Sequence, residues 1–316
     1  MPIKIDRNLG EQLGSLEWFA KQTVEGFITG MHKSPFHGFS VEFAEHRLYN
    51  AGDSLRHLDW KLLARTEKMF LKRYDEETNL RSFILIDHSS SMTFPHGVHP
   101  ESKNWNKFKF SIYASAALIE LFRRQRDAVS LSFFDQRITS TTKAATSDAH
   151  VRRLFAQLEE ALSSMKDQLQ LTTQLSESIH QMAEEIPRRS LVILFSDMFE
   201  NNAHTEDLFN ALQHLRYNKH EVVIFHTVDA SKEMKFEWEN RPYTFIDPET
   251  LEEVKLNPSA YKEQYLHKMQ EWKSALALKC GQYQIDWMEV HIQAGYNEIL
   301  QTYLIKRQKM GLSAMV

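Results

Sequence analysis

Residues 82–92, SFILIDHSSSM, contain a strand-like run followed directly by a cluster of oxygen-bearing side chains. After Ser82, the strand-like run is apolar and rich in β-branched and aromatic side chains, which is typical of a strand buried on both faces. Asp87 and the serines after it place oxygen atoms where this strand ends. Open α/β sheets bind ligands at the carboxyl ends of their strands, so the stretch predicts a strand and a binding loop together.

Similar strand-like runs recur along the chain, separated by segments in which apolar residues return every three or four positions, as on one face of a helix. The further strand-like runs are residues 129–134, 191–195, 221–225 and, more weakly, 284–288. The helix-like segments are residues 108–122, 151–162, 175–186, 208–215, 258–276 and 299–304. This alternation predicts a Rossmann-like α/β fold for residues 81–316, with a mostly parallel central sheet and helices on both faces.

Two parts of the sequence stand outside this alternation. Residues 243–256, centred on Asp247-Pro248-Glu249-Thr250, are expected to form a β-hairpin inserted into the α/β domain. Residues 1–80 are dense in charged and aromatic side chains, with a helical start at residues 13–27. We interpret them as an N-terminal extension that packs on the α/β domain.

The composition limits the classes of partner and compartment. A formal net charge of -4 gives no electrostatic reason to expect nucleic acid as a partner. The single cysteine, Cys280, excludes an intramolecular disulfide and a thiolate zinc site, which fits a reducing compartment. The longest apolar run, residues 191–195, is far shorter than the roughly 20 residues that cross a bilayer. With no signal-peptide pattern at the N-terminus, we expect a cytoplasmic protein without a transmembrane segment; peripheral membrane association through a partner stays open.

Oxygen donors from three loops are expected to meet at the carboxyl edge of the predicted sheet. Asp87, Ser89 and Ser91 form a D-x-S-x-S pattern after the first strand, Thr173 precedes a helix, and Asp197 directly follows a later strand. Carboxylate and hydroxyl oxygens are hard ligands that suit Mg²⁺, Mn²⁺ or Ca²⁺. Taken singly, Ser89, Ser91, Thr173 and Asp197 are equally well explained as helix caps.

The order of these residues resembles the metal-ion-dependent adhesion site of von Willebrand factor A domains. The resemblance implies that the two serines and the threonine ligate a metal directly or through water, while the two aspartates act largely through water. It also implies a vacant position that accepts a carboxylate from a partner, and Mg²⁺ as the expected cation. Thr172 is an alternative to Thr173, and Gln174 stands where many relatives have an acidic residue.

A second resemblance is carried by FAEHRLYNAGDSLRHLDW, residues 43–60, followed by Ala64-Arg65 and by residues 72–74. This pattern resembles the signature of the domain of unknown function 58 family, and the resemblance extends over roughly residues 36–308. It implies a bacterial protein with a von Willebrand A-like domain after the signature. Members often accompany MoxR-type AAA+ ATPases, so such an ATPase is the implied partner. Many relatives are membrane-anchored, whereas no anchor is predicted here.

The charged residues of the signature also allow a purely structural interpretation. They would form an ion-pair lattice around Trp60 that clamps the extension to the α/β domain, and a partner surface is the alternative. The residues concerned are Arg47, Asp53, Arg56, Asp59 and Arg65.

Two classes of function stay open at this point. The first is a non-enzymatic binding or scaffold protein, whose metal site captures an acidic side chain of a client protein. The second is a divalent-metal-dependent phosphatase or phosphotransferase of haloacid dehalogenase-like type, which Asp87, a later threonine and Asp197 also resemble. Ser89 counts against the enzyme because it replaces the second aspartate of D-x-D, the general acid of such reactions. No lysine stands clearly in a phosphate-binding role, and no phosphate-binding glycine motif occurs. We therefore expect no catalytic activity.

Overall fold

The computed structural model divides the chain into two units, Thr29–Asn79 and a larger one made of Met1–Ile28 with Leu80–Val316. The residues described are 15–31, 43–48, 60–66, 68–74, 80–99, 104–135, 137–165, 174–199 and 205–313. Each unit is described by itself.

The smaller unit contains a two-stranded antiparallel sheet and a short helix. The strands are β1 (Phe43–Leu48) and β2 (Phe70–Tyr74), and the helix is α3 (Trp60–Thr66). Trp60 begins this helix. Asp53, Arg56 and Asp59 lie outside the described residues, and the lattice stays a prediction.

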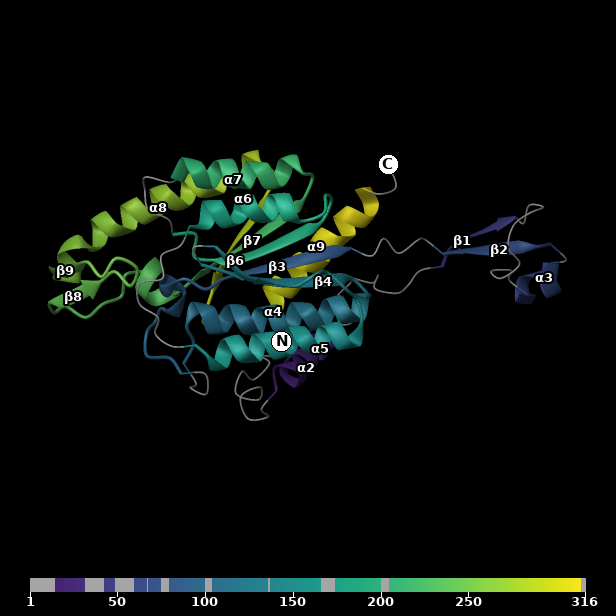
Figure 1. Cartoon of the computed structure of the whole chain (residues 1–316), viewed down its shortest axis with the longest axis horizontal. Coiled ribbons are helices and arrows are strands. Elements are labelled where there is room, and N and C mark those ends of the chain that lie inside the picture. Colours follow the sequence, from purple (N-terminus) through teal and green to yellow (C-terminus); the bar gives the residue numbers. More distant parts are fainter. Residues whose placement is uncertain are drawn as a thin grey trace. The chain divides into compact units, whose positions relative to one another are not determined.

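A six-stranded sheet forms the centre of the larger unit, in the order β10-β7-β6-β3-β4-β5 (Figure 1). Five strands are parallel and correspond to the predicted runs: β3 (Arg81–Asp87), β4 (Ala128–Phe134), β6 (Leu191–Ser196), β7 (Glu221–Val228) and β10 (Asp286–His291). The middle strands β3, β4 and β6 are buried on both faces apart from Arg81. The mostly parallel α/β fold is therefore confirmed.

The sixth strand, β5 (Ile138–Thr141), was not predicted from the sequence. It pairs antiparallel with β4 at one edge of the sheet, and its residues alternate between half-buried and exposed. A four-residue edge strand of this kind lacks the continuous apolar run by which buried parallel strands are found.

Helices cover both faces of the sheet (Figure 1). On one face lie α4 (Lys107–Gln125) and α5 (Asp148–Ser163); α9 (Asn297–Ser313) contacts α4 through Tyr303, whose ring lies 4.7 Å from that of Phe122. Helix α2 (Leu16–Met31) also packs on α4, with the rings of Phe19 and Tyr113 4.8 Å apart. The opposite face carries α6 (Leu175–Glu185), α7 (Thr205–Tyr217) and α8 (Pro258–Gln282).

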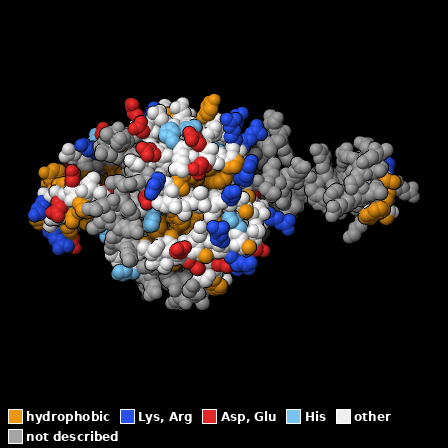
Figure 2. Space-filling view, viewed as in Figure 1, with side chains coloured by type: hydrophobic (Ala, Val, Ile, Leu, Met, Phe, Trp, Pro, Cys, Tyr) orange, Lys and Arg blue, Asp and Glu red, His pale blue; other side chains and the backbone are white. Residues whose placement is uncertain are grey.

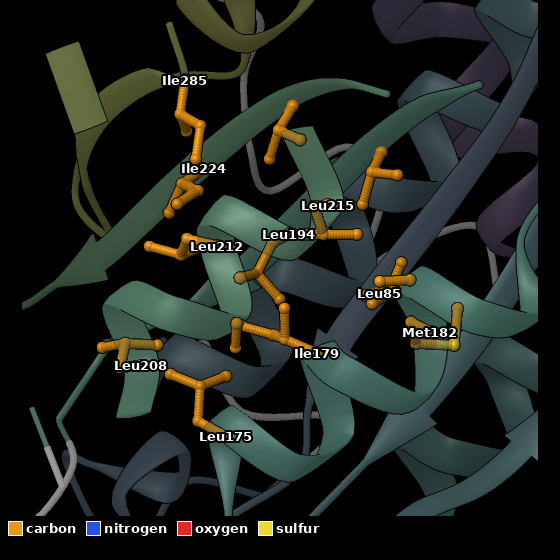
Figure 3. Close-up of a cluster of buried hydrophobic side chains, with 14 of the residues drawn as sticks. Leu85, Leu175, Ile179, Met182, Leu194, Leu208, Leu212, Leu215, Ile224 and Ile285 are labelled. Atoms are coloured by element: carbon orange, nitrogen blue, oxygen red, sulfur yellow. The ribbon is translucent and has the colours of Figure 1, made fainter. Parts of the chain in front are cut away.

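The apolar core between the sheet and α6 and α7 is drawn in Figure 3. Leu85, Leu194 and Ile224 come from three adjacent strands and are in register with one another. They lie against Ile179 of α6 and Leu212 of α7, and all are nearly fully buried. Burial of such side chains contributes about 1.5–3 kcal/mol each, so this layer fixes the positions of the strand ends that carry the site.

The predicted hairpin is present as β8 (Tyr243–Ile246) and β9 (Glu253–Leu256), which pair antiparallel. Aromatic contacts anchor it: the ring of Phe245 lies 5.1 Å from that of Trp238. The following helix α8 begins as expected, because the Asn257 side chain accepts a hydrogen bond from the Ser259 N–H and Pro258 occupies the first turn. Within the described ranges, no helix is long and apolar enough to cross a membrane.

Candidate functional site

The strand order places a topological switch between β3 and β6. Counted from β3, the order is the 3-2-1-4-5-6 arrangement of doubly wound sheets, in which the chain turns one way from β3 to β4 and the other way to β6. Ligands bind in such sheets outside the carboxyl ends of the two strands at the switch. Asp87 ends β3 and Asp197 directly follows β6, so both predicted aspartates stand at this position.

Asp87 is a buried carboxylate held in a fixed orientation. It is 1% exposed, its Oδ1 accepts a hydrogen bond from the Ser89 N–H at 2.9 Å, and its Oδ2 accepts one from the Ser196 hydroxyl at 2.7 Å. Burial and then the nearby Asp197 carboxylate raise the pKa of Asp87 to about 7, against the opposing effect of the hydrogen bonds from Ser196 and Ser89. The ionised carboxylate would therefore be stabilised by a cation at this position.

Two hydroxyl groups lie beside this carboxylate. The Oγ atoms of Ser89 and Ser91 are 3.0 Å apart. Ser89 precedes the short 3₁₀ helix Ser90–Thr93, yet its side chain makes no capping hydrogen bond to that helix. The helix-cap explanation thus does not account for Ser89, and its hydroxyl stays next to that of Ser91.

Asp197 is equally buried, at 1% exposure, and both of its oxygens have partners. Oδ1 accepts a hydrogen bond from the Phe199 N–H at 3.2 Å, and Oδ2 receives one from Lys107 Nζ at 2.7 Å. Because α7 begins only at Thr205, Asp197 does not cap that helix. Of the predicted site residues, Asp87, Ser89, Ser91 and Asp197 thus lie at one edge of the sheet.

The fifth predicted residue, Thr173, and its alternative Thr172 lie outside the described residues. Gln174, the next residue along, is described, and its backbone N–H donates to the carbonyl of Asp135 just after β4. The part of the threonines in the site stays a prediction.

Sequence reasoning missed two residues that contact the aspartates. Ser196 is the last residue of β6 and binds Asp87; the register of adjacent strands, which pairs Ile86 with Phe195, is the signal that could have found it. Lys107 opens α4 and reaches Asp197 and, at 2.8 Å, Glu233. Lysines near helix ends are ordinarily solvated, so no local sequence signal indicates that this one is buried.

Lys107 carries a charge in the interior of the protein. Burial opposes that charge, but the carboxylates of Asp197 and Glu233 outweigh burial and hold the pKa of Lys107 above its usual value. Burial raises the pKa of Glu233, and Lys107 acts against that rise. When all four groups are ionised, the three carboxylates of Asp87, Asp197 and Glu233 exceed the one ammonium by two negative charges.

The donor set fits a hard divalent cation. Carboxylate and hydroxyl oxygens are available, and the excess of negative charge favours a cation of charge two. Among the residues that the structure describes, no three carboxylate, imidazole or thiolate side chains are grouped to hold a metal ion. The direct ligands of a cation at this position would therefore include the hydroxyl oxygens of Ser89 and Ser91 and water molecules.

His226 lies close to the site on β7, in register with Ser196. It is fully buried, and neither ring nitrogen has a hydrogen-bond partner in the described part of the chain. Its ring stacks on Trp287 at 5.4 Å and also adjoins Trp272. Burial lowers the pKa of His226 to about 4, so the imidazole is neutral near pH 7 and does not supply a positive charge to the site.

The surface of the larger unit carries charged side chains of both signs. On the face seen in Figure 2, acidic and basic side chains are interspersed, with no extended field of one sign. This distribution accords with the small net charge of the chain.

The strand order, with acidic and hydroxyl side chains at its switch point, is that of a doubly wound α/β domain with a candidate ligand site. The chain belongs to the family described as protein of unknown function DUF58, whose sequence profile matches residues 45–274. The family resemblance seen in the sequence is thereby confirmed.

Relatives and solved structures are similar over different shares of the chain. Uncharacterized proteins of Mycobacterium bovis and Mycobacterium tuberculosis are 33% identical over 89 residues, which is 28% of this chain and 28% of each relative. The match thus spans under a third of the length of these curated relatives. The conserved hypothetical protein BatB of Bacteroides thetaiotaomicron is 12% identical, with a TM-score of 0.42 over 73% of this chain and 99% of that one. The SpRpn10 VWA domain is 10% identical, with a TM-score of 0.36 over 70% and 93%.

Proposed function

We propose that the chain is a non-enzymatic scaffold that binds a divalent cation, Mg²⁺ in the first place, and through it an acidic side chain of a client protein. The observation that carries the proposal is the grouping of Asp87, Ser89, Ser91 and Asp197 at the switch point of the sheet. The hydroxyls of both serines lie together and are not spent on a helix cap.

The chain's own residues would hold the cation as follows. Ser89 and Ser91 supply neutral oxygen ligands, Thr173 is the proposed third hydroxyl, and Asp87 and Asp197 act through water. When bound, the cation would offer a vacant coordination position, and a carboxylate oxygen of another protein is a ligand that such a hard ion prefers. The residues around it keep Asp87 oriented and exclude bulk water.

The proposed partner is a MoxR-type AAA+ ATPase, as the family resemblance implies. In this arrangement the chain would couple the ATPase to its client, and a carboxylate of either protein would bind at the cation. Matches to uncharacterized relatives neither name a client nor exclude one.

The alternative, a haloacid dehalogenase-like phosphotransferase, has one observation that bears on it. Such an enzyme uses a lysine on the phosphate, and Lys107 lies beside Asp197. However, Lys107 is 1% exposed, and two of its three N–H donors already bind carboxylates of the chain. The Ser89 hydroxyl is too weak an acid to replace a carboxylic acid as the general acid near neutral pH.

The proposal is tested by capture of the MoxR-type ATPase on the immobilised chain, with magnesium and with EDTA. Capture should fall with EDTA and in Ser91→Ala. Ser82→Ala is the matched control, because Ser82 is a buried serine at the other end of β3. Capture that neither EDTA nor Ser91→Ala weakens contradicts the metal-dependent scaffold. Magnesium-dependent turnover of a phosphate ester that Asp87→Asn abolishes would establish the enzyme instead.

A further inference from the structure

Lys107 joins the candidate site to a second element of the fold. Its Nζ lies 2.7 Å from Asp197 Oδ2 and 2.8 Å from Glu233 Oε1, and its side chain is 1% exposed. The rings of Phe94 and Phe199 flank the ammonium, with centroids 5.7 and 5.6 Å away. The charge is thus surrounded by two carboxylates and two aromatic rings and is shielded from water.

Glu233 is itself held by the backbone, so the ammonium has a fixed second partner. Glu233 Oε2 accepts a hydrogen bond from the Asp229 N–H at 2.7 Å, where β7 passes into the turn Ala230–Met234. Asp229 in turn accepts hydrogen bonds from Ser231 and from Gln293. The Lys107 ammonium is therefore held in place even if Asp197 moves, because its second partner, Glu233, is fixed by hydrogen bonds in a separate segment of the chain.

The position of this ammonium bears directly on any cation at the sheet edge. It occupies one oxygen of Asp197, and the Phe199 N–H occupies the other. Charges of the same sign at such short range repel strongly where water is excluded. A divalent ion near Asp87 and Asp197 would have to bind against this repulsion.

We propose that Lys107 is a resident cation of the site, which neutralises Asp197 in the metal-free protein and sets the affinity for the divalent ion by competing with it. The proposal rests on the metal-dependent function proposed above and names the residue that regulates it. Lys107 is a positioning and affinity-determining residue, and it does not itself ligate the metal.

The decisive variant is Lys107→Met, which keeps an unbranched side chain one atom shorter than that of lysine and removes the charge. Affinity for Mn²⁺, measured by calorimetry and by the electron paramagnetic resonance signal of the free ion, should rise on the order of tenfold or more at fixed salt. The matched control is Lys109→Met. Lys109 is equally buried two residues further along α4, but its ammonium lies over the ring of Trp105, at 4.8 Å, so its removal should leave Mn²⁺ affinity unchanged.

A second variant covers the case in which Lys107→Met does not fold. Glu233→Gln keeps the ammonium and its contact with Asp197 and removes one negative charge, so Mn²⁺ affinity should fall. In the double variant Lys107→Met, Glu233→Gln the ammonium and one of its carboxylates disappear together. Its affinity should lie between those of the two single variants.

The outcomes separate this inference from the function on which it rests. Tighter Mn²⁺ binding in Lys107→Met than in the unmodified chain and in Lys109→Met supports it. Mn²⁺ binding that appears only in Lys107→Met also supports the role of Lys107, but it overturns the proposal that the unmodified chain acts through a bound cation. Unchanged or weaker binding in Lys107→Met, or tighter binding in Glu233→Gln, overturns the role of Lys107 and leaves the proposed function standing. No Mn²⁺ binding in any variant overturns the proposed function and this inference with it.

Discussion

Replacing Ser196 by alanine removes a hydroxyl that makes two hydrogen bonds in the interior. The hydroxyl donates to Asp87 Oδ2 at 2.7 Å and accepts from the Met198 N–H at 2.9 Å, and Ser196 is fully buried. A buried donor or acceptor left without its partner costs about 1–3 kcal/mol, and more when it is charged. Since both partners stay in place, we expect Ser196→Ala to lower the free energy of unfolding by about 2–4 kcal/mol.

Ser82→Ala is the matched control for this measurement. Ser82 is also fully buried and lies on the neighbouring strand β3, but its hydroxyl has no hydrogen-bond partner in the part of the chain that the structure describes. Removing it breaks no hydrogen bond and takes a polar atom out of an apolar environment, so the free energy of unfolding should stay the same or rise.

Urea unfolding followed by circular dichroism measures both variants, with the midpoint and the slope fitted separately. The expected result is a lower midpoint for Ser196→Ala and an unchanged or higher one for Ser82→Ala, at equal slopes. Equal losses in the two variants would refute the reasoning, because the cost would then follow from the loss of any buried hydroxyl and not from the bonds to Asp87 and Met198.

Two further predictions concern buried polar groups of the larger unit. Folding lowers the pKa of His226 from 6.5 to about 4, so below about pH 6.5 the imidazole binds a proton more readily in the unfolded chain than in the folded one. The free energy of unfolding should therefore fall by about 3 kcal/mol as pH falls from about 6.5 to 4. Asp87, whose pKa is raised to about 7, changes the stability in the opposite direction over nearly the same pH range. The free energy of unfolding is therefore measured against pH for the unmodified chain and for His226→Phe, and the second curve is subtracted from the first. A difference that does not change with pH contradicts the prediction. Tyr303→Phe removes a buried hydroxyl that donates to Asp127 Oδ2 at 2.6 Å and should lower the free energy of unfolding by about 1.5–3 kcal/mol. Tyr261→Phe, at a tyrosine that is 50% exposed, should change the melting temperature little, and equal shifts in the two tyrosine variants would contradict the account.

The sequence was sufficient for the parallel sheet because its strands are buried on both faces. Runs such as residues 82–86 and 191–195 have no polar alternation that would let them lie at a surface, and the helices between them repeat with a period of three to four. The hairpin at residues 243–256 was predicted from turn chemistry alone. The edge strand β5 was missed because its four residues alternate in polarity and depend on pairing with β4 for their conformation.

The candidate site was predictable only as far as topology determines it. Asp87 and Asp197 follow strands that were recognised, and the carboxyl ends of parallel strands meet at one edge of the sheet. Lys107 was not predictable, because its burial depends on partners 90 and 126 residues away in the sequence. Contacts of that kind follow from how α4 packs on the sheet and leave no local signal in the chain.

Binding of a divalent cation at the carboxyl edge of β3 and β6 is tested by a calorimetric Mn²⁺ titration of the full chain and of the double variant Asp87→Ala, Ser89→Ala. We expect one divalent ion per chain in the unmodified protein and loss of that binding in the double variant. Circular dichroism should show that the variant keeps its helices and strands. Undiminished Mn²⁺ binding by the folded double variant would contradict the assignment of the cation to the carboxyl edge of β3 and β6.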